Sequence, residues 1–337
     1  MGTLLKTRRW MLFVFMSIVL IAASGNTVPV GSVSAKEKPV DYPIAVSDQA
    51  SRQIIVYDPD KKDWSKKNAV LWKWSPSSEN GFADLTPYWG LPTEGRVRYS
   101  SFHKRLVMAV TDSRGLAALI PFPEGDQRLW GLYVGGNPHA AEVLPDGNIA
   151  VASSTGGWVR VYTASQGSDS STYAEYRQTS AHGATWDPVN EILWTIGNRE
   201  IAGLKLSGTA DRPELTLHVR LEVERLNGHD IQPVLGDPDR LWVASGGKVY
   251  QYIKSTNSLD LTYPGVEKIS RVGVKAVGSQ WSGQVVETVT DYAKTPRGGC
   301  TMSIWCTETV DFFSPDVTRT VPGAAFYKAR ILNPFYY

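Results

Sequence analysis

The chain has 337 residues, and its 35 lysine and arginine residues nearly balance 33 aspartate and glutamate residues, giving a formal net charge of +2. A nucleic-acid-binding protein normally shows a strong basic excess, so this balance excludes nucleic acid as the expected partner. The sequence also shows no long amphipathic helix, coiled-coil heptad or low-complexity tract, which leaves short β-strands as the main predicted element.

The first 35 residues have the features of a secretory signal peptide. Three basic residues precede an apolar run over residues 10–23, and small-residue cleavage signals follow at Val33–Ala35 and, as a rival, at Ala22–Ser24. An uncleaved membrane anchor is the alternative, but a span needs about 20 apolar residues. We expect cleavage near Ala35, which changes the net charge from +2 to −1, and a secreted protein without membrane contact.

After the leader, paired apolar runs separated by polar turn residues recur along the chain, as in β-hairpins. Tight-turn sequences such as Pro145–Asn148 and Asp187–Asn190 join most of these hairpins to an earlier strand. The predicted hairpins occupy residues 44–57, 106–120, 149–162, 192–206 and 241–252.

A fourth strand follows each hairpin, and the last candidate is residues 324–331. Four strands in a repeat of about 45 residues predict a propeller blade. Residues 36–337 are therefore expected to form a single all-β domain, a six-bladed β-propeller of four-stranded blades. The first blade lacks its own first strand. Either residues near Asp41 and Tyr42 supply that strand, or the segment Ala325–Ile331 closes the ring.

Five basic residues recur at nearly the same place in successive repeats, 43, 43, 47 and 46 positions apart. Each precedes the next hairpin by ten or twelve residues, at the start of the first strand of its blade. First strands line the axis of a propeller, so these side chains are expected to form a ring at one mouth of the channel. The predicted ligand-binding residues are Arg96, His139, His182, His229 and Lys275.

Three interpretations of this basic ring remain open. In the first, it binds an anionic small ligand such as an acidic saccharide, a carboxylate or a phosphate. In the second, His139, His182 and His229 hold a divalent metal, manganese or zinc, in a polysaccharide lyase or hydrolase. Glu142 is then the candidate catalytic base. In the third, the ring is structural, and the protein is a scaffold that binds proteins through its loops. We expect a monomer in each case.

The two cysteines, Cys300 and Cys306, are separated by five residues. In an exported protein such a pair predicts a small disulfide loop. The alternative is two free thiols, and a zinc site would need more ligands of this kind nearby.

The segment Pro138–Ala152 resembles the repeat of NHL-type and gluconolactonase-like propellers. Four further segments resemble a family of exported bacterial six-bladed propellers of unknown function: Gly228–Ile231, Val274–Val277, Thr309–Phe313 and Ala325–Arg330. The resemblance covers residues 44–332 and implies the fold and export. Gluconolactonase-like enzymes hold their metal with Glu, Asn and Asp, whereas this chain has His and Lys at the corresponding rim, so that activity is not carried over.

Overall fold

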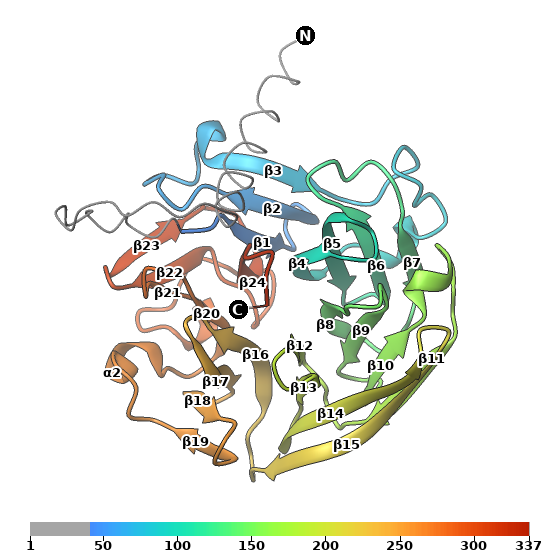
Figure 1. The fold of residues 1–337 in the computed structure, drawn as a ribbon. Helices are drawn as coiled ribbons and strands as arrows, with labels where there is room; N and C mark the ends of the chain where they lie inside the picture. Colours follow the sequence, from blue (N-terminus) through green and yellow to red (C-terminus); the bar gives the residue numbers. More distant parts are fainter. Residues whose placement is uncertain (1–40, 337) are drawn as a thin grey trace, which may run out of the picture. The chain divides into compact units, whose positions relative to one another are not determined.

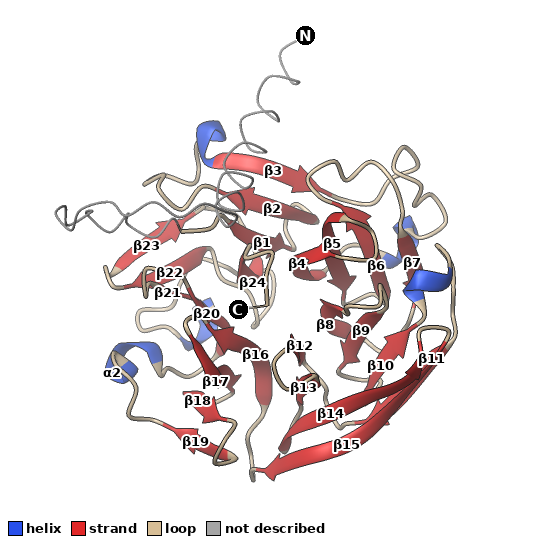
Figure 2. Cartoon of the chain, in the orientation of Figure 1, coloured by secondary structure: helices blue, strands red, loops and turns tan. Residues whose placement is uncertain are grey.

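The computed structural model describes residues 41–336. Their 24 strands form six antiparallel sheets of four strands each. The sheets are arranged around a common axis, with their innermost strands facing the centre (Figure 1; Figure 2). The protein is thus a six-bladed β-propeller, which confirms the predicted fold class. The predicted signal peptide lies outside the described residues.

The blades are numbered here in chain order, and their strands are given from the axis outward. Blade 1 contains β24 (Phe326–Ile331), β1 (Ile44–Asp48), β2 (Gln53–Tyr57) and β3 (Val70–Trp74). Blade 2 contains β4 (Pro92–Ser100), β5 (Arg105–Asp112), β6 (Leu116–Pro121) and β7 (Trp130–Tyr133). Blade 3 contains β8 (Pro138–Val143), β9 (Ile149–Ser153), β10 (Trp158–Tyr162) and β11 (Tyr173–Arg177).

The remaining blades follow the same plan. Blade 4 contains β12 (Gly183–Asp187), β13 (Ile192–Ile196), β14 (Glu200–Thr209) and β15 (Arg212–Glu222). Blade 5 contains β16 (Gly228–Val234), β17 (Asp237–Ser245), β18 (Val249–Ile253) and β19 (Ser258–Asp260). Blade 6 contains β20 (Val274–Ser279), β21 (Val285–Val289), β22 (Thr309–Phe313) and β23 (Val317–Thr320).

Helical turns are short and lie in the connections. They are η1 (Lys67–Ala69), η2 (Thr86–Tyr88), η3 (Ala164–Gln166), α2 (Val266–Ile269) and η4 (Asp291–Ala293). Within the part of the chain that the structure describes, none of the helices has the length and apolar character needed to span a membrane.

The ring is closed by a strand from the far end of the sequence. β24 pairs with β1 in antiparallel register, with Ile331 opposite Ile44 and Arg330 opposite Ala45. Of the two alternatives for the missing first strand, the one that uses residues 325–331 is therefore confirmed. The sequence also predicts residues 324–331 as the fourth strand of the last blade. That assignment is wrong, because β23 occupies the fourth position, paired with β22. Pairing β24 with β1 leaves neither blade 1 nor blade 6 with an open seam.

Apolar side chains pack between neighbouring blades. Between blades 1 and 6, Tyr57 stacks on Trp64 with ring centroids 4.4 Å apart, and Phe326 and Phe312 contact these rings edge-on. All four side chains are buried. Such aromatic contacts between sheets explain why every blade carries large residues on its strands: a twisted four-stranded sheet has two faces to cover.

The predicted disulfide is confirmed: Cys300 and Cys306 are bonded within the long connection between β21 and β22. Asp291 fixes this connection, because its carboxylate accepts hydrogen bonds from the backbone N–H groups of Cys300 and Glu308, both at 3.0 Å. A Cβ at Gly298 would lie 2.2–2.6 Å from that carboxylate, so only glycine allows the chain to pass this closely. The loop is thus closed covalently and held at its base.

Candidate functional site

The innermost strands share an irregularity where they enter the channel. A β-bulge shifts the register between Pro138 and Ala140 in β8, between Gly228 and Asp230 in β16, and between Val274 and Ala276 in β20. The bulged residues are His139, His229 and Lys275. A bulge inserts one unpaired residue and redirects side chains. The bulge therefore allows two consecutive residues of one strand to place their side chains near the propeller axis.

Six residues, one from each blade, occupy this position, and we call them the mouth layer. In blade 4, His182 immediately precedes β12, and its backbone N–H donates to the carbonyl of Ile196. In blade 1 the irregularity in β24 includes Tyr327. The mouth layer consists of Thr93, His139, His182, His229, Lys275 and Tyr327.

Arg96 does not belong to the mouth layer, and its predicted position is wrong. In blade 2 the bulge lies between Pro92 and Glu94, so Thr93 is the residue equivalent to His139. Arg96 pairs with Ala109 as Glu142 pairs with Ala150, and each lies three residues beyond the mouth position of its strand, deeper along the axis. The sequence spacing was misleading because β4 and its turn to β5 differ in length from the corresponding segments of blade 3.

The other four predicted residues come together in a continuous arc. The rings of His139 and His182 stack at a centroid distance of 4.5 Å, and those of His182 and His229 meet edge-on at 5.2 Å. Lys275 Nζ then donates to His229 Nε2 at 2.9 Å. Tyr327 extends the arc on the other side, 5.3 Å from His139. Groups separated by up to 136 residues in the predicted set are thus neighbours.

The three imidazoles are held neutral. Burial, together with the neighbouring cations, lowers the pKa of His139 and of His229 well below the ordinary value for histidine. Burial also lowers the pKa of His182 to about 4. His182 Nδ1 lies 2.8 Å from the carbonyl oxygen of Ser180. Because a carbonyl only accepts, the proton lies on Nδ1, and Nε2 is left as a hydrogen-bond acceptor.

Lys275 is the unusual cation of the mouth layer. Its side chain is 2% exposed, and burial, reinforced by the charge of Lys328, lowers its pKa to about 7. Its contacts are neutral: His229 and the indole of Trp305, whose centroid lies 4.2 Å from Nζ. Among residues 41–336 no carboxylate lies within ion-pair distance of Lys275. A buried cation is normally paired, so this one has an unmet preference for a negative charge.

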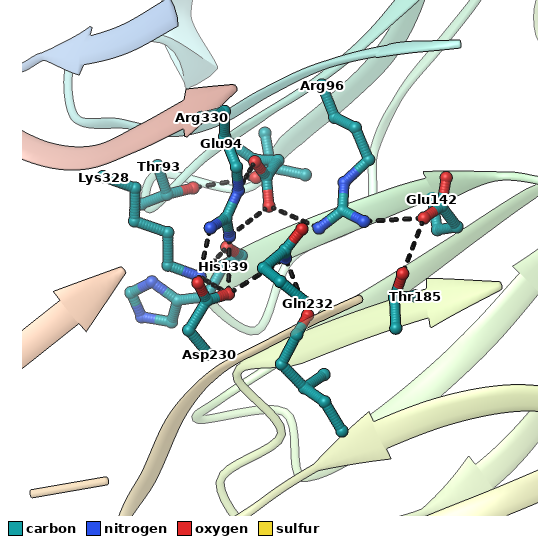
Figure 3. Close-up of polar contacts among 12 residues, drawn as sticks. Thr93, Glu94, Arg96, His139, Glu142, Thr185, Asp230, Gln232, Lys328 and Arg330 are labelled. Carbon is teal, nitrogen blue, oxygen red and sulfur yellow. Dashed lines mark hydrogen bonds and ion pairs between the residues drawn. The ribbon is translucent and has the colours of Figure 1, made fainter. Parts of the chain in front are cut away.

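Below the mouth layer, seven buried charged residues form what we call the axial ion cluster. Figure 3 shows that side chains from several blades converge there. Three are carboxylates and four are cations, which leaves one positive charge uncompensated. The members are Glu94, Glu142, Asp230, Arg96, Arg98, Lys328 and Arg330.

Lys328 and Arg330, both from β24, cross the axis. Lys328 Nζ donates to the backbone carbonyls of His139 and His182 at 3.0 and 3.1 Å, the two residues whose imidazoles stack. Figure 3 shows Lys328 beside His139 and Asp230. The side chain of Lys328 is fully buried, and its pKa is lowered to about 8 by burial, against the opposing effect of Asp230. The mouth layer therefore has a cationic floor.

Neither Lys328 nor Arg330 was among the predicted site residues. Both lie on the segment whose position in the ring was ambiguous from the sequence, so no axial role could be assigned to them. A signal was present: the Lys-Ala pair at 275–276 recurs at 328–329. In the structure the two Lys-Ala pairs do not occupy equivalent positions. Tyr327 is the residue of β24 that corresponds to Lys275 of β20, so Lys328 lies one position further along its strand.

Glu142, the candidate catalytic base, belongs to the axial ion cluster. Arg98 contacts both of its oxygens at 2.9 Å, and Arg96 Nη1 contacts Oε2 at 2.6 Å. Burial alone would raise the pKa of Glu142, but the charges of Arg98 and Arg96 outweigh it and lower the pKa. A fully buried carboxylate with two arginine partners is a weak base with no free lone pair, so the arrangement favours a structural role.

His139, His182 and His229 are also the predicted ligands of a divalent metal. Within residues 41–336 no group of three or more His, Cys, Asp or Glu side chains is placed to hold a metal ion. Lys275 donates to His229 Nε2, and Lys328 lies below His139 and His182. Both ammonium groups would repel a divalent cation and attract an anion. The geometry favours the anion hypothesis, and the manganese or zinc site stays a prediction for elemental analysis.

One buried atom of the mouth layer has its hydrogen-bonding capacity unused. His139 Nδ1 has no partner among the described residues, although the side chain is only 7% exposed. In the axial ion cluster, Arg96 Nη2 is 3.5 Å from Glu94 Oε2, which is an ion pair without a hydrogen bond. Buried polar atoms are normally satisfied, so His139 Nδ1 points to a further partner at the mouth.

A pocket lies at the opposite ends of the inner strands, beyond the axial ion cluster. It is lined by residues that include Gln232, Gly278, Asn333 and Phe335. Arg98 and Arg330 also contribute, but their charges are already engaged by Glu142, Glu94 and Asp230. Among the described residues that line this pocket, no cation lacks a carboxylate partner as Lys275 does, so the mouth layer is the stronger candidate site.

A family model described as "Family of unknown function (DUF6528)" matches residues 6–292. The chain belongs to this family. No curated protein matches the chain. It is similar to a protein of unknown function from Bacteroides caccae, whose crystal structure was determined at 1.35 Å resolution. That similarity covers 74% of this chain and 84% of that chain, with 13% sequence identity and a TM-score of 0.48.

In this member of the family, the mouth layer combines three chemical properties. It has a buried ammonium group without a carboxylate partner, neutral imidazoles with free nitrogens, and an indole at its edge. The combination is suited to holding an anion.

Proposed function

We propose that the protein binds an anionic small ligand, such as an acidic saccharide, a carboxylate or a phosphate, at the mouth layer. The observation that carries the proposal is Lys275, a buried lysine whose neighbours are an imidazole and an indole. The cationic floor at Lys328 and the net positive charge of the axial ion cluster add to the local potential. A bound anion would supply the missing counter-charge.

Binding should depend on pH, because the ammonium form of Lys275 attracts the ligand. Its pKa of about 7 means that the charged fraction grows as the pH falls from 8 to 6. An anion that binds will itself raise this pKa, since opposite charges stabilise the ammonium form.

Isothermal titration calorimetry with acetate, phosphate and galacturonate at pH 6 and pH 8 tests the proposal. We expect at least one anion to bind more tightly at pH 6, and Lys275→Gln to abolish the binding. Lys248→Gln, which removes an exposed lysine of blade 5, is the matched control and should leave the affinity unchanged. Absence of binding by all three anions, or equal binding by Lys275→Gln, would contradict the proposal.

We also propose that the protein acts outside the cytoplasm as a monomer. The Cys300–Cys306 disulfide supports export, because disulfides persist in oxidising compartments. The expected cleavage near Ala35 predicts a mature N-terminus at Lys36, which mass spectrometry of the secreted protein checks. Light scattering at several protein concentrations checks the monomer.

A further inference from the structure

The loop closed by the Cys300–Cys306 disulfide reaches from blade 6 to the mouth layer. Trp305, the residue before Cys306, places its indole over Lys275 with 4.2 Å between Nζ and the ring centroid. Yet the indole remains 51% exposed, in contrast to Lys275 at 2%. Trp305 therefore uses part of its surface to cover the ammonium group and presents the rest to solvent.

Two properties distinguish the loop that carries Trp305 from an ordinary surface loop. The neighbours of Trp305 on the loop, Met302 and Ile304, are also about half exposed, so the loop displays apolar side chains instead of burying them. At the same time the loop is held rigidly, by the disulfide and by the hydrogen bonds from Cys300 and Glu308 to Asp291. A fixed backbone that carries an exposed aromatic ring at a charged site is a typical recognition arrangement.

We propose that Trp305 is part of the ligand site and that the ligand is an acidic saccharide, with its ring face on the indole and its carboxylate at Lys275. This inference rests on the proposed function and deepens it by naming the ligand class. A pyranose ring has an apolar face of C–H groups that packs on an aromatic ring. The indole offers such a surface next to the ammonium group.

The imidazoles of the mouth layer are suited to form hydrogen bonds with the hydroxyl groups of such a ligand. His182 carries its proton on Nδ1, so Nε2 accepts, and His139 Nδ1 is buried without a partner. Hydroxyl groups both donate and accept, so they can satisfy neutral imidazoles in either tautomer. Inorganic phosphate, which mainly accepts at neutral pH, matches these atoms less well. The three features together favour a ligand with one negative charge, several hydroxyl groups and a flat apolar face.

The experiment compares ligands that differ in one feature at a time. Galacturonate, glucuronate and mannuronate carry the charge, hydroxyl groups and ring face. Galactose lacks the charge, benzoate lacks the hydroxyl groups, and acetate lacks the ring. Calorimetry at pH 6 should show the best hexuronate binding at least tenfold more tightly than acetate, benzoate or galactose.

Variants of Trp305 connect this preference to the indole. Trp305→Ala should reduce hexuronate affinity at least tenfold and leave acetate affinity within twofold. Trp305→Phe, which keeps an aromatic face, should retain most of the affinity. Because Trp305 is half exposed, both variants should melt within a few degrees of the wild type, and the melting temperature is measured for each.

The outcomes separate this inference from the proposed function. If no anion binds, or if galactose binds as tightly as the hexuronates, the proposed function fails. If acetate and the hexuronates bind equally and depend on Lys275 but not on Trp305, only the present inference fails. Benzoate binding as tight as that of the best hexuronate would overturn the assignment to a saccharide.

Discussion

Arg330 bridges two carboxylates that lie on opposite sides of the propeller axis. Its Nη2 donates to Asp230 Oδ1 of blade 5 at 2.7 Å, and its Nε donates to Glu94 Oε1 of blade 2 at 2.6 Å. All three side chains are buried. One residue of β24 thus connects blade 1, which it closes, with two others. A buried ion cluster of this kind is sensitive to the loss of one member, because the buried partners of that member then lose part of their charge compensation.

Replacing Arg330 by alanine should destabilise the protein by about 3–5 kcal/mol, since Glu94 and Asp230 would lose their main partner in the low-dielectric interior. Urea unfolding measures the change. The matched control is Arg225→Ala, whose ion pair with Glu224 is 4.0 Å long and highly exposed. Exposed pairs contribute roughly 0–1 kcal/mol, so Arg225→Ala should unfold like the wild type. Equal midpoints for both variants would show that the axial ion cluster does not stabilise the ring.

Lys275→Met should make the protein more stable at low pH. The pKa of Lys275 is about 7 in the folded protein, below its ordinary value of 10.5, so between these values only the unfolded chain binds the proton. Stability from this group therefore rises with pH from about 7 to 10.5, and the penalty is complete below pH 7. Calorimetric scans should show a melting temperature several degrees above wild type at pH 6 and a smaller gain near pH 10.

The same variant should fail to bind anions, because methionine has no charge. A gain in stability with a loss of binding is the expected behaviour of a residue kept for function. A lower melting temperature for Lys275→Met at pH 6 would instead indicate that the lysine has a structural role.

Acid should destabilise the propeller through its imidazoles. Burial lowers the pKa of His182 to about 4, and the unfolded side chain takes up a proton near pH 6.5. The unfolded state thus binds more protons between these values, and stability falls as the pH is lowered from 6.5 towards 4. His182→Gln should show a shallower decline of melting temperature over this range. His218→Gln, on the exposed face of β15, should keep the wild-type slope.

Removing the disulfide should affect recognition more than folding. The Cys300–Cys306 loop is short, so the chain-entropy model assigns it only about 2 kcal/mol. The double variant Cys300→Ser, Cys306→Ser should still unfold cooperatively, since the six blades do not depend on this connection. We expect hexuronate affinity to fall towards that of Trp305→Ala, measured by calorimetry. Unchanged affinity would mean that Asp291 alone holds Trp305 in place.

Much of the fold could be predicted because its signals are local. A hairpin such as β9–β10 is encoded by two apolar runs around a turn, and repetition of this pattern predicts a ring of blades. Closure by β24 could not be chosen over its alternative, because pairing between Ile44 and Ile331 leaves no local signal. Arg96 was misplaced for a related reason: spacing to the next hairpin does not report the bulge at Thr93.

The histidines and Lys275 were found because their spacing follows the repeat. Trp305 could not be found in this way, because it lies in the β21–β22 connection, which is much longer than the equivalent connections of the other blades that the structure describes. Only the three-dimensional path of the Cys300–Cys306 loop brings its indole to Nζ of Lys275.

The position of β24 in the sequence has a consequence for biogenesis. A ribosome synthesises Glu94 and Asp230 long before Arg330, so both carboxylates are made before the arginine that pairs with them in the folded protein. The lysine beneath the imidazoles arrives with the same late strand. A chain that ends before residue 326 would therefore lack both the strand that closes blade 1 and the buried cations next to the mouth layer. We expect such a chain to stay open between blades 1 and 6 and to be sensitive to proteolysis.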